Sequence, residues 1–364
     1  MNRFLKITFL ALVLLLGAWF VAPLRAANCY VYTDSVGHVC ISEPSQPTFV
    51  EPEPFADSFL GRRTYARLGD LINVHAAPSL GAPVVRNVGD GFLFSTLVTG
   101  VESEGELWYM INPDEYVRAD DLRIVDDSTF TGVEVTTQPE RPFGWVLAPV
   151  FPSRAPGAEP EPGTPKLDRY TFFQVYDAVP VQEPDQDWIW YNIGGGYWVR
   201  QTFVSLVDVS APPAEVGPGE FWVEVDLYEQ SFAAYEGQRM VYAGLVSSGL
   251  NQWPTNEGLF QVWSRHTEVK MSGAEGKVDY YFIEDVPHTM FFDGEIALHG
   301  AYWHDRFGYK HSHGCVNMPP RAAEWVFDWS AEASNDLYVW VHTSDPYGAL
   351  VDPAIDPVEN FAGP

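Results

Sequence analysis

Residues 297–318 read ALHGAYWHDRFGYKHSHGCVNM, and within them a lone cysteine, Cys315, follows the His299–Gly300 pair by sixteen residues. This layout is typical of a thiol acyl-transfer site. A thiol attacks a carbonyl only as thiolate, so it needs a nearby imidazole to take its proton and backbone N–H donors to hold the oxyanion. His299 and the turn at Gly314–Cys315 are the candidates for these two tasks.

The chain begins with a segment that has the pattern of an export signal. Arg3 and Lys6 precede an unbroken apolar run over residues 7–16, and residues 23–27 (PLRAA) offer a cleavage region. We therefore expect residues 1–27 to be a signal peptide and the protein to act outside the cytoplasm, in the periplasm or cell wall. The alternative is a retained anchor, because the run approaches a short membrane span. Only this uncleaved segment would then contact the membrane.

Charge argues against nucleic acid as a partner. The chain has 21 Lys+Arg against 49 Asp+Glu, a net charge of −28, whereas phosphate binding requires a basic surface. The sequence also has no Gly-rich phosphate loop and no dinucleotide fingerprint, so it predicts no nucleotide cofactor.

The three cysteines divide into a close pair and a single residue. Cys29 and Cys40 flank a stretch that contains the turn-forming residues 34–37, so a hairpin could bring them together as a disulfide in an oxidising compartment. Cys315 is then an odd thiol, and an odd thiol in an exported protein is a candidate reactive group. The alternative is a buried, inert cysteine.

Proline-rich stretches divide the chain, and an internal repeat with an offset of 82 residues lies between them. The pattern WYxI followed by VR at residues 108–118 recurs at residues 190–200. Short aromatic and β-branched runs with turns between them predict two small antiparallel barrels, and the first copy resembles a bacterial SH3-like domain. We expect this order: signal or anchor 1–27, Pro/Glu-rich segment 28–60, SH3-like domain 61–127, second and diverged SH3-like repeat 140–209, linker 210–219, catalytic domain 220–344 and acidic tail 345–364.

From residue 220 the sequence predicts a larger β domain. Residues 222–227 alternate as a half-buried strand does, and residues 231–246 predict a hairpin. Residues 319–330 predict a helix with prolines in its first turn, and residues 337–342 predict a closing strand. One face of this helix carries Ala322, Trp325, Val326 and Trp329. The expected fold class is mainly β: a sandwich-like catalytic domain with one short helix after the cysteine motif, preceded by two small barrels.

This last domain contains the motifs WVEVDL (222–227), YEG (235–237), VSSG (246–249), PTNEGLF (254–260), KM (270–271), HG (299–300) and SHGCVN (312–317). On these motifs it resembles the L,D-transpeptidases of bacterial peptidoglycan, from about Phe221 to His342. Two departures bear on which donor is accepted: family members often read Thr-Pro-x-Gly where this chain has Pro254–Thr255, and many have Arg in place of Asn317.

The resemblance implies that Cys315 is the nucleophile and His299 its proton partner, with the carbonyl of Gly300 orienting the imidazole. The substrate would be a peptidoglycan stem peptide. Cys315 would attack the carbonyl that precedes the terminal D-Ala of a tetrapeptide, and a side-chain amine of a second stem would take the acyl group. The resemblance implies no metal and no cofactor, and we expect a monomer.

Neighbouring residues would support this pair. The helix start after Cys315 would favour the thiolate. Met271 and Tyr281 lie in a segment that in the family folds over the donor peptide, and their alternative is core packing. The remaining expected roles are oxyanion binding by the N–H groups of His313, Gly314 and Cys315, and support of the turn by Ser312, His313 and Asn317.

Other interpretations stay open. A wall-peptide hydrolase or L,D-carboxypeptidase would use the same Cys/His site with water as acceptor, and a non-catalytic wall-binding protein would have lost the activity. A metal site could use His299, His304, His311, His313 and Cys315, but zinc-type spacings such as Cys-x-x-Cys do not occur. His288, His304 and His311 are instead expected in loops or at the surface. Because every catalytic candidate follows Pro218, we expect a fragment starting there to carry the activity.

Overall fold

The computed structural model describes residues 48–53, 63–89, 91–182, 187–273, 280–333 and 336–344, together with the backbone of residues 29–34 and 37–42. The chain divides into two compact units, Met1–Pro47 and Thr48–Pro364. The expected signal peptide (1–27) and acidic tail (345–364) lie outside the described residues. None of the helices that are described is long and apolar enough to cross a membrane.

The first unit contains an antiparallel hairpin, β1 (Cys29–Asp34) and β2 (Gly37–Ser42). The pairing of the two strands confirms the hairpin expected between the two cysteines. In its register Cys40 pairs with Val31 and Cys29 with Ser42, so the cysteines are diagonal neighbours. The disulfide expected between them concerns side chains outside the described set and stays a prediction.

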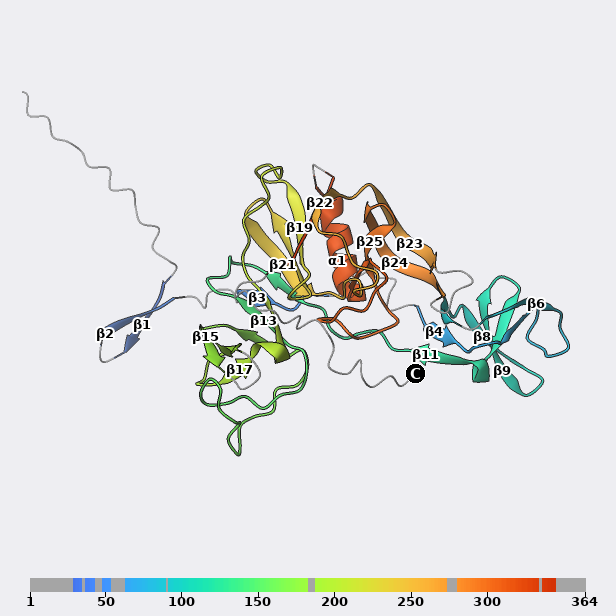
Figure 1. Ribbon diagram of the computed structural model, residues 1–364, viewed down its shortest axis with the longest axis horizontal. Helices are drawn as coiled ribbons and strands as arrows, with labels where there is room; N and C mark the ends of the chain where they lie inside the picture. Colours follow the sequence, from blue (N-terminus) through green and yellow to red (C-terminus); the bar gives the residue numbers. More distant parts are fainter. Residues whose placement is uncertain are drawn as a thin grey trace, which may run out of the picture. The chain divides into compact units, whose positions relative to one another are not determined.

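The second unit contains two seven-stranded sheets (Figure 1). The first has the order β22-β27-β19-β20-β21-β12-β3, in which only β19 and β27 are parallel. The strand, hairpin and closing strand predicted within residues 220–344, the expected catalytic domain that we call the catalytic region, are confirmed. The closing strand lies inside the sheet. The strands are β22 (Gly258–Gln261), β27 (Tyr338–His342), β19 (Phe221–Asp226), β20 (Ser231–Glu236), β21 (Arg239–Leu245), β12 (Val133–Val135) and β3 (Phe49–Val50).

The second sheet contains strands from both sides of the boundaries predicted between the first barrel and the catalytic domain. Its order is β11-β4-β7-β24-β25-β26, and β23 pairs with β24. The amino-terminal module, which we define as the described residues of 63–125, supplies β4 (Tyr65–Leu68), β7 (Phe92–Thr96) and β11 (Leu122–Val125). The catalytic region supplies β23 (Ser264–Gly273), β24 (Tyr281–Asp293), β25 (Ile296–Gly300) and β26 (Val316–Met318).

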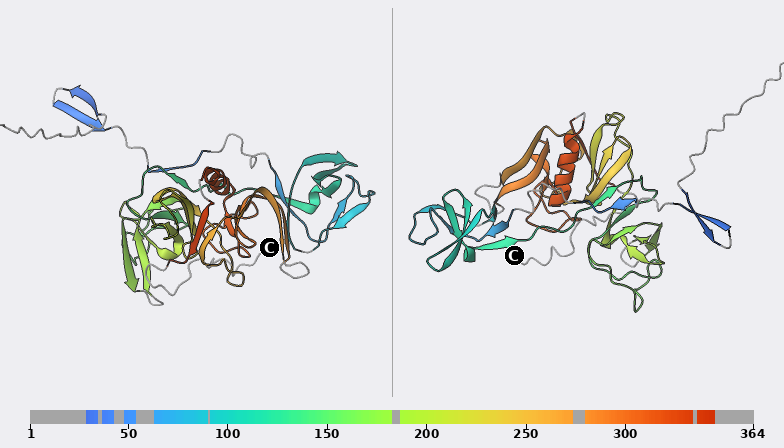
Figure 2. Two further views of the ribbon diagram at one scale, coloured as in Figure 1. Left: turned by 90° about the horizontal axis from the view of Figure 1, so that it is seen from above. Right: turned by 180° about the vertical axis from the view of Figure 1, so that it is seen from behind.

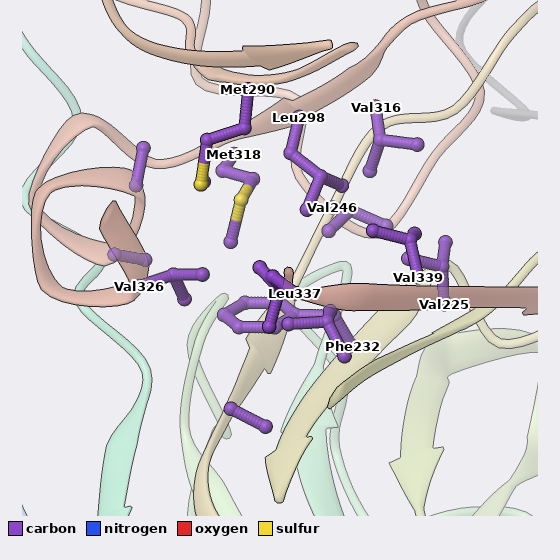
Figure 3. Close-up of a cluster of buried hydrophobic side chains, with 14 of the residues drawn as sticks. Val225, Phe232, Val246, Met290, Leu298, Val316, Met318, Val326, Leu337 and Val339 are labelled. Carbon is purple, nitrogen blue, oxygen red and sulfur yellow. The ribbon is translucent and has the colours of Figure 1, made fainter. Parts of the chain in front are cut away.

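One hydrophobic cluster joins both sheets to α1 (Pro320–Ala331). Figure 3 shows Phe232 of the first sheet and Met290 and Leu298 of the second around Val326 of the helix, and each of these side chains is at most 1% exposed. The helix predicted at 319–330 is thereby confirmed, and proline suits its first turn because the missing N–H has no partner there. Packing of α1 fixes the position of β26, which directly precedes it.

The internal repeat is a structural repeat. In the first copy β9 (Glu106–Asn112) pairs with β10 (Glu115–Arg118), and Trp108 lies opposite Arg118. In the second copy β16 (Asp187–Asn192) pairs with β17 (Trp198–Arg200), and Trp190 lies opposite Arg200. Each copy continues into a 3-10 turn, η2 (Ala119–Asp121) or η3 (Gln201–Phe203), and then a strand. The likeness of the copies to SH3-like domains stays a prediction.

Three smaller sheets complete these repeats, with the orders β6-β5-β10-β9-β8, β14-β13-β18 and β15-β16-β17. Figure 2 shows them from two further directions. Their remaining strands are β5 (Asn73–His75), β6 (Val84–Asn87), β8 (Thr99–Ser103), β13 (Phe143–Val146), β14 (Phe172–Gln174), β15 (Asp177–Gln182) and β18 (Val204–Val207).

The amino-terminal module is joined to the catalytic region through β24. The Phe92 N–H donates to the Tyr280 carbonyl oxygen at 3.0 Å, and β7 continues as a parallel partner of β24. Tyr65 stacks on Tyr302 with ring centroids 3.7 Å apart. A fragment starting near Pro218 would lose these contacts and leave an edge of β24 open. The activity expected of such a fragment stays a prediction.

Gly91→Ala should destabilise this junction, whereas Gly89→Ala should not. A Cβ at Gly91 would lie 2.8 Å from the Tyr280 carbonyl oxygen, while a Cβ at Gly89 meets nothing within 4 Å. Overpacking of this kind typically costs about 1–3 kcal/mol. Calorimetry of the chain without residues 1–27 should show a lower Tm for Gly91→Ala alone. Equal Tm values for the two variants would contradict the junction.

Candidate active site

Parallel pairing of two short strands brings the halves of the motif together. β25 ends with the His299–Gly300 pair, and β26 begins one residue after Cys315. In the register His299 lies opposite Asn317. Parallel neighbours need a crossover connection, which residues 301–315 supply. The spacing of sixteen residues in the motif is thus one connection between adjacent strands.

Ser312 and Thr255 hold the turn that presents Cys315. The Ser312 hydroxyl donates to the Cys315 carbonyl oxygen and accepts the Gly314 N–H at 3.1 Å. Thr255 Oγ1 donates to the Gly314 carbonyl oxygen at 2.8 Å and accepts the Gly249 N–H at 2.9 Å. Gly314 has a φ of +117°, a conformation that side-chain-bearing residues rarely adopt. The threonine of the Pro-Thr motif therefore bonds directly to the cysteine turn.

These hydrogen bonds remove one of the three N–H donors that were expected to line the oxyanion hole. The Gly314 N–H already donates to Ser312 Oγ, so it is not directed at a substrate. The oxyanion roles expected of the N–H groups of His313 and Cys315 stay predictions. Two donors are enough for an oxyanion hole, because each is typically worth about 3 kcal/mol in the transition state.

A buried amide anchors the same turn to the first sheet. The Ser248 carbonyl oxygen accepts the N–H groups of His311 at 2.9 Å and Ser312 at 3.0 Å. Gln230, which is 0% exposed, accepts the Ser248 N–H at 2.8 Å and donates to Ser248 Oγ at 2.7 Å. The position of the cysteine turn thus depends on a residue that no motif indicated.

His299 is a buried, neutral imidazole. It is 2% exposed, and burial lowers its pKa to about 4, against a smaller opposing effect of the Gly300 carbonyl. Nδ1 lies 3.2 Å from that carbonyl oxygen, which can only accept, so Nδ1 carries the proton. The lone pair of Nε2 is then free to receive a proton. This is the contact with Gly300 that the resemblance implies.

The Cys315 side chain is half-buried, and its surroundings favour the neutral thiol. Burial raises the pKa of the thiol to about 11; a hydrogen bond from the Ala297 backbone opposes this rise, and the charge of Glu295 adds to it. Sγ lies 3.8 Å from the Glu295 carbonyl oxygen. The modest effect of the helix start on the thiolate stays a prediction; α1 begins five residues after Cys315, beyond β26, and the net direction of the thiol pKa is upward because desolvation is the largest cause.

A second histidine supports Asn317. The side-chain amide nitrogen of Asn317 and Nε2 of His304 lie 2.8 Å apart, and His304 Nδ1 accepts the Arg306 N–H at 3.1 Å. Burial, together with the neighbouring His311, lowers the pKa of His304 well below its usual value. His304 does lie in a loop, as expected, but it is part of the site rather than a plain surface residue.

The histidines of the motif are engaged separately. The His313 ring lies 4.0 Å from that of Trp253, and the His299 ring lies 5.6 Å from that of Trp303. Across the described part of the chain, no group of three or more His, Cys, Asp or Glu residues could hold a metal ion. The geometry therefore favours the thiol interpretation over the metal interpretation.

A cleft of about 480 Å³ opens at the cysteine–histidine pair. The Tyr281 ring lies 5.2 Å from that of His313, so the hairpin β23–β24 reaches across to the cysteine loop. Gly300 and Gly314 contribute backbone groups to the site, and the roles of the individual residues stay predictions. The other expected site residues all line the cleft: Cys315, His299, Ser312, His313, Asn317, Met271 and Tyr281.

Sequence reasoning missed part of the cleft wall. Leu250 and Trp303 come from loops of the catalytic region, whereas Arg67, Asp70 and the Gly91–Phe92 pair come from the amino-terminal module. The short apolar run Phe92–Phe94 after a turn indicates a strand, but it does not indicate which strand pairs with it. That pairing with β24 is what brings the module to the cleft.

Fold and site together define a β domain built around a cysteine–histidine pair in a peptide-sized cleft. Residues 220–347 match the family model YkuD, the L,D-transpeptidase catalytic domain. This match supports an L,D-transpeptidase catalytic domain in that part of the chain.

The chain is also similar to individual proteins. “Putative L,D-transpeptidase YciB” of Bacillus subtilis (strain 168) is 28% identical over 147 residues, which are 36% of this chain and 73% of YciB. A mutant L,D-transpeptidase of Enterococcus faecium is 25% identical over 34% of this chain and 50% of its own, with a TM-score of 0.30. An L,D-transpeptidase from Mycobacterium smegmatis is 19% identical over 60% of this chain and 93% of its own, with a TM-score of 0.32. The chain thus spans about half the length of the first solved structures it matches.

Alkylation of Cys315 by iodoacetamide should accelerate with pH well beyond neutrality. The thiol pKa of about 11 lies above the working range, so the thiolate fraction rises about tenfold per pH unit up to that value. Mass spectrometry of the folded protein between pH 6 and pH 10 measures the rate, with free cysteine as the control that levels off near its own pKa. A plateau below pH 8 would show a preformed thiolate–imidazolium pair instead.

Proposed function

We propose that this protein is an exported L,D-transpeptidase that forms peptidoglycan cross-links through an acyl-enzyme on Cys315. The observation that carries the proposal is the shared cleft: Cys315, His299 and Asn317 open into one space large enough for a peptide, within the segment that matches the family. Export rests on the pattern of residues 1–27, and no cofactor enters the reaction.

The first step is acylation. Cys315 Sγ attacks the carbonyl carbon between the third residue of a tetrapeptide stem, a diamino acid, and its terminal D-Ala. His299 Nε2 takes the thiol proton during the attack and passes it to the departing amine of D-Ala. Because thiol and imidazole are both neutral at rest, proton transfer accompanies attack rather than preceding it. The N–H groups of Cys315 and His313 stabilise the oxyanion.

The second step transfers the acyl group. A side-chain amine of a second stem attacks the thioester carbonyl, and His299 takes the proton that this amine loses. The sulfur leaves as the carbon–sulfur bond breaks and recovers its proton from His299. The products are a cross-linked dimer and the free enzyme. Water in place of the amine would give a tripeptide, which is the L,D-carboxypeptidase outcome.

Incubation of the chain without residues 1–27 with tetrapeptide fragments should give a dimer that has lost one D-Ala. Mass spectrometry detects this product and the thioester on Cys315. Cys315→Ala should give neither, while its circular dichroism spectrum stays that of the parent. Hydrolysed tripeptide as the sole product would favour the carboxypeptidase, and an unchanged activity of Cys315→Ala would reject the thiol mechanism.

His299→Gln should fold but acylate slowly. Glutamine fills a similar volume in this buried position and offers an amide donor to the Gly300 carbonyl, but it cannot take the thiol proton. General base assistance is commonly worth about 10²–10⁴-fold in rate. Single-turnover formation of the thioester measures the loss, with His266→Gln, outside the cleft, as control. A loss below about tenfold would assign the proton transfer to another group.

A further inference from the structure

The wall of the cleft carries a cation from the amino-terminal module. Arg67 of β4 lines the same space as Cys315 and His299, although it precedes them by more than two hundred residues. It reaches the cleft because β4 pairs with β7, which in turn pairs with β24. The module is therefore not only a tethered domain; it forms part of the catalytic cleft.

The sheet register explains the direction of the Arg67 side chain. In a row across four strands, Arg123 of β11 lies opposite Arg67, Arg67 opposite Phe94, and Phe94 opposite Ile283 of β24. Residues directly opposite one another point to the same face of a sheet. Ile283 lines the cleft, so this face is the one that the cleft occupies next to β24.

The Arg67 guanidinium has no carboxylate partner among the described residues. Its Cζ lies 5.9 Å from the centre of the Phe92 ring, and its other neighbours in the row are Arg123 and Phe94. By contrast, Arg63 of the same module forms an ion pair with Glu268 at 2.6 Å. An arginine without an acid partner is unexpected in a chain with 49 acidic residues and 21 basic ones.

The charge of the cleft differs from that of the chain. Among the described residues that line it, Arg67 and Arg306 are cationic and Asp70 is the acidic one, while the chain as a whole has a net charge of −28. A concave site with a local positive charge attracts anionic groups. Arginine binds carboxylates through two parallel N–H donors.

We propose that Arg67 binds a carboxylate of the stem peptide in the catalytic cleft and so makes the amino-terminal module a determinant of substrate specificity. This inference rests on the proposed function for the identity of the ligand. Two sources offer the same group: the terminal D-Ala carboxylate of the donor, and a carboxylate at the side-chain end of the third residue, which diaminopimelate has and lysine lacks. Both would hold the peptide along the row that leads from Arg67 to Ile283.

Binding measured without turnover tests this assignment. The Cys315→Ala chain, without residues 1–27, is titrated calorimetrically with four diaminopimelate tetrapeptides: unmodified, amidated at the terminus, amidated at the side-chain carboxylate, and amidated at both. Arg67→Met should weaken binding of the unmodified peptide about 10- to 100-fold. Arg67→Lys should lie between, since it keeps the charge and loses the planar fork. Arg123→Met, on the adjacent strand and outside the cleft wall, is the matched control and should change nothing.

The amidated peptides identify the carboxylate and expose a merely structural role. Amidation at the recognised group should weaken binding to the parent as much as Arg67→Met does, and should remove the effect of Arg67→Met. An equal effect of Arg67→Met on all four peptides, or no effect on any, would overturn the proposal.

Turnover of the unmodified peptide by the chain with Cys315 is scored separately. Arg67-dependent binding without any turnover would reject the proposed function alone, and turnover without dependence on Arg67 would reject the carboxylate site alone.

Discussion

The catalytic geometry depends on the parallel pairing of β25 with β26. This register sets His299 beside Asn317 and places Cys315 at the entry of its strand. A slip of one residue would turn every side chain of one strand to the opposite face and remove His299 or Asn317 from the cleft. The preceding residue on each strand points to the other face and fixes the register. These residues, Leu298 and Val316, are 0% exposed and belong to the hydrophobic cluster that also contains residues of α1. Hydrophobic packing therefore determines where the reactive groups lie.

Hydrogen bonds then determine the conformation of the cysteine turn, whose position is set by hydrophobic packing. The cysteine turn contains closely spaced backbone groups, of which the Gly314 N–H and carbonyl make buried hydrogen bonds, and an unsatisfied buried group costs about 1–3 kcal/mol. Ser312, Thr255 and Gln230 satisfy these groups from three different segments of the chain. Each hydroxyl or amide both donates and accepts, so removing one member leaves two partners unsatisfied. The order Pro254–Thr255 is compatible with this network because it is the threonine hydroxyl that bonds to Gly314.

Local patterns were enough to predict the strands and the helix of the catalytic region, and spacing together with family resemblance found Cys315 and His299. Alternation and proline placement act within a few residues, so they can be recognised without knowledge of the tertiary contacts. The sheet shared with the amino-terminal module was not predictable in this way, because the edges of β strands offer the same backbone groups to every partner. The place of Arg67 in the cleft depends on that pairing. The rise of the thiol pKa was also not predicted from the sequence, since it depends on desolvation by residues far apart in the chain.

A neutral thiol has a consequence for a protein that acts in an oxidising compartment, as proposed here. Oxidants and disulfides react with thiolates far faster than with thiols, so a raised pKa slows both reactions at Cys315. The cost is a weaker nucleophile at rest, and in the proposed mechanism His299 offsets it only when a carbonyl is in place to accept the sulfur. Reactivity then depends on how the peptide is positioned, which makes the cleft wall as important as the pair itself. The cleft wall comes from two parts of the chain, and β24 pairs with strands of both. The same wall would therefore select the substrate and keep the thiol unreactive until the substrate is bound.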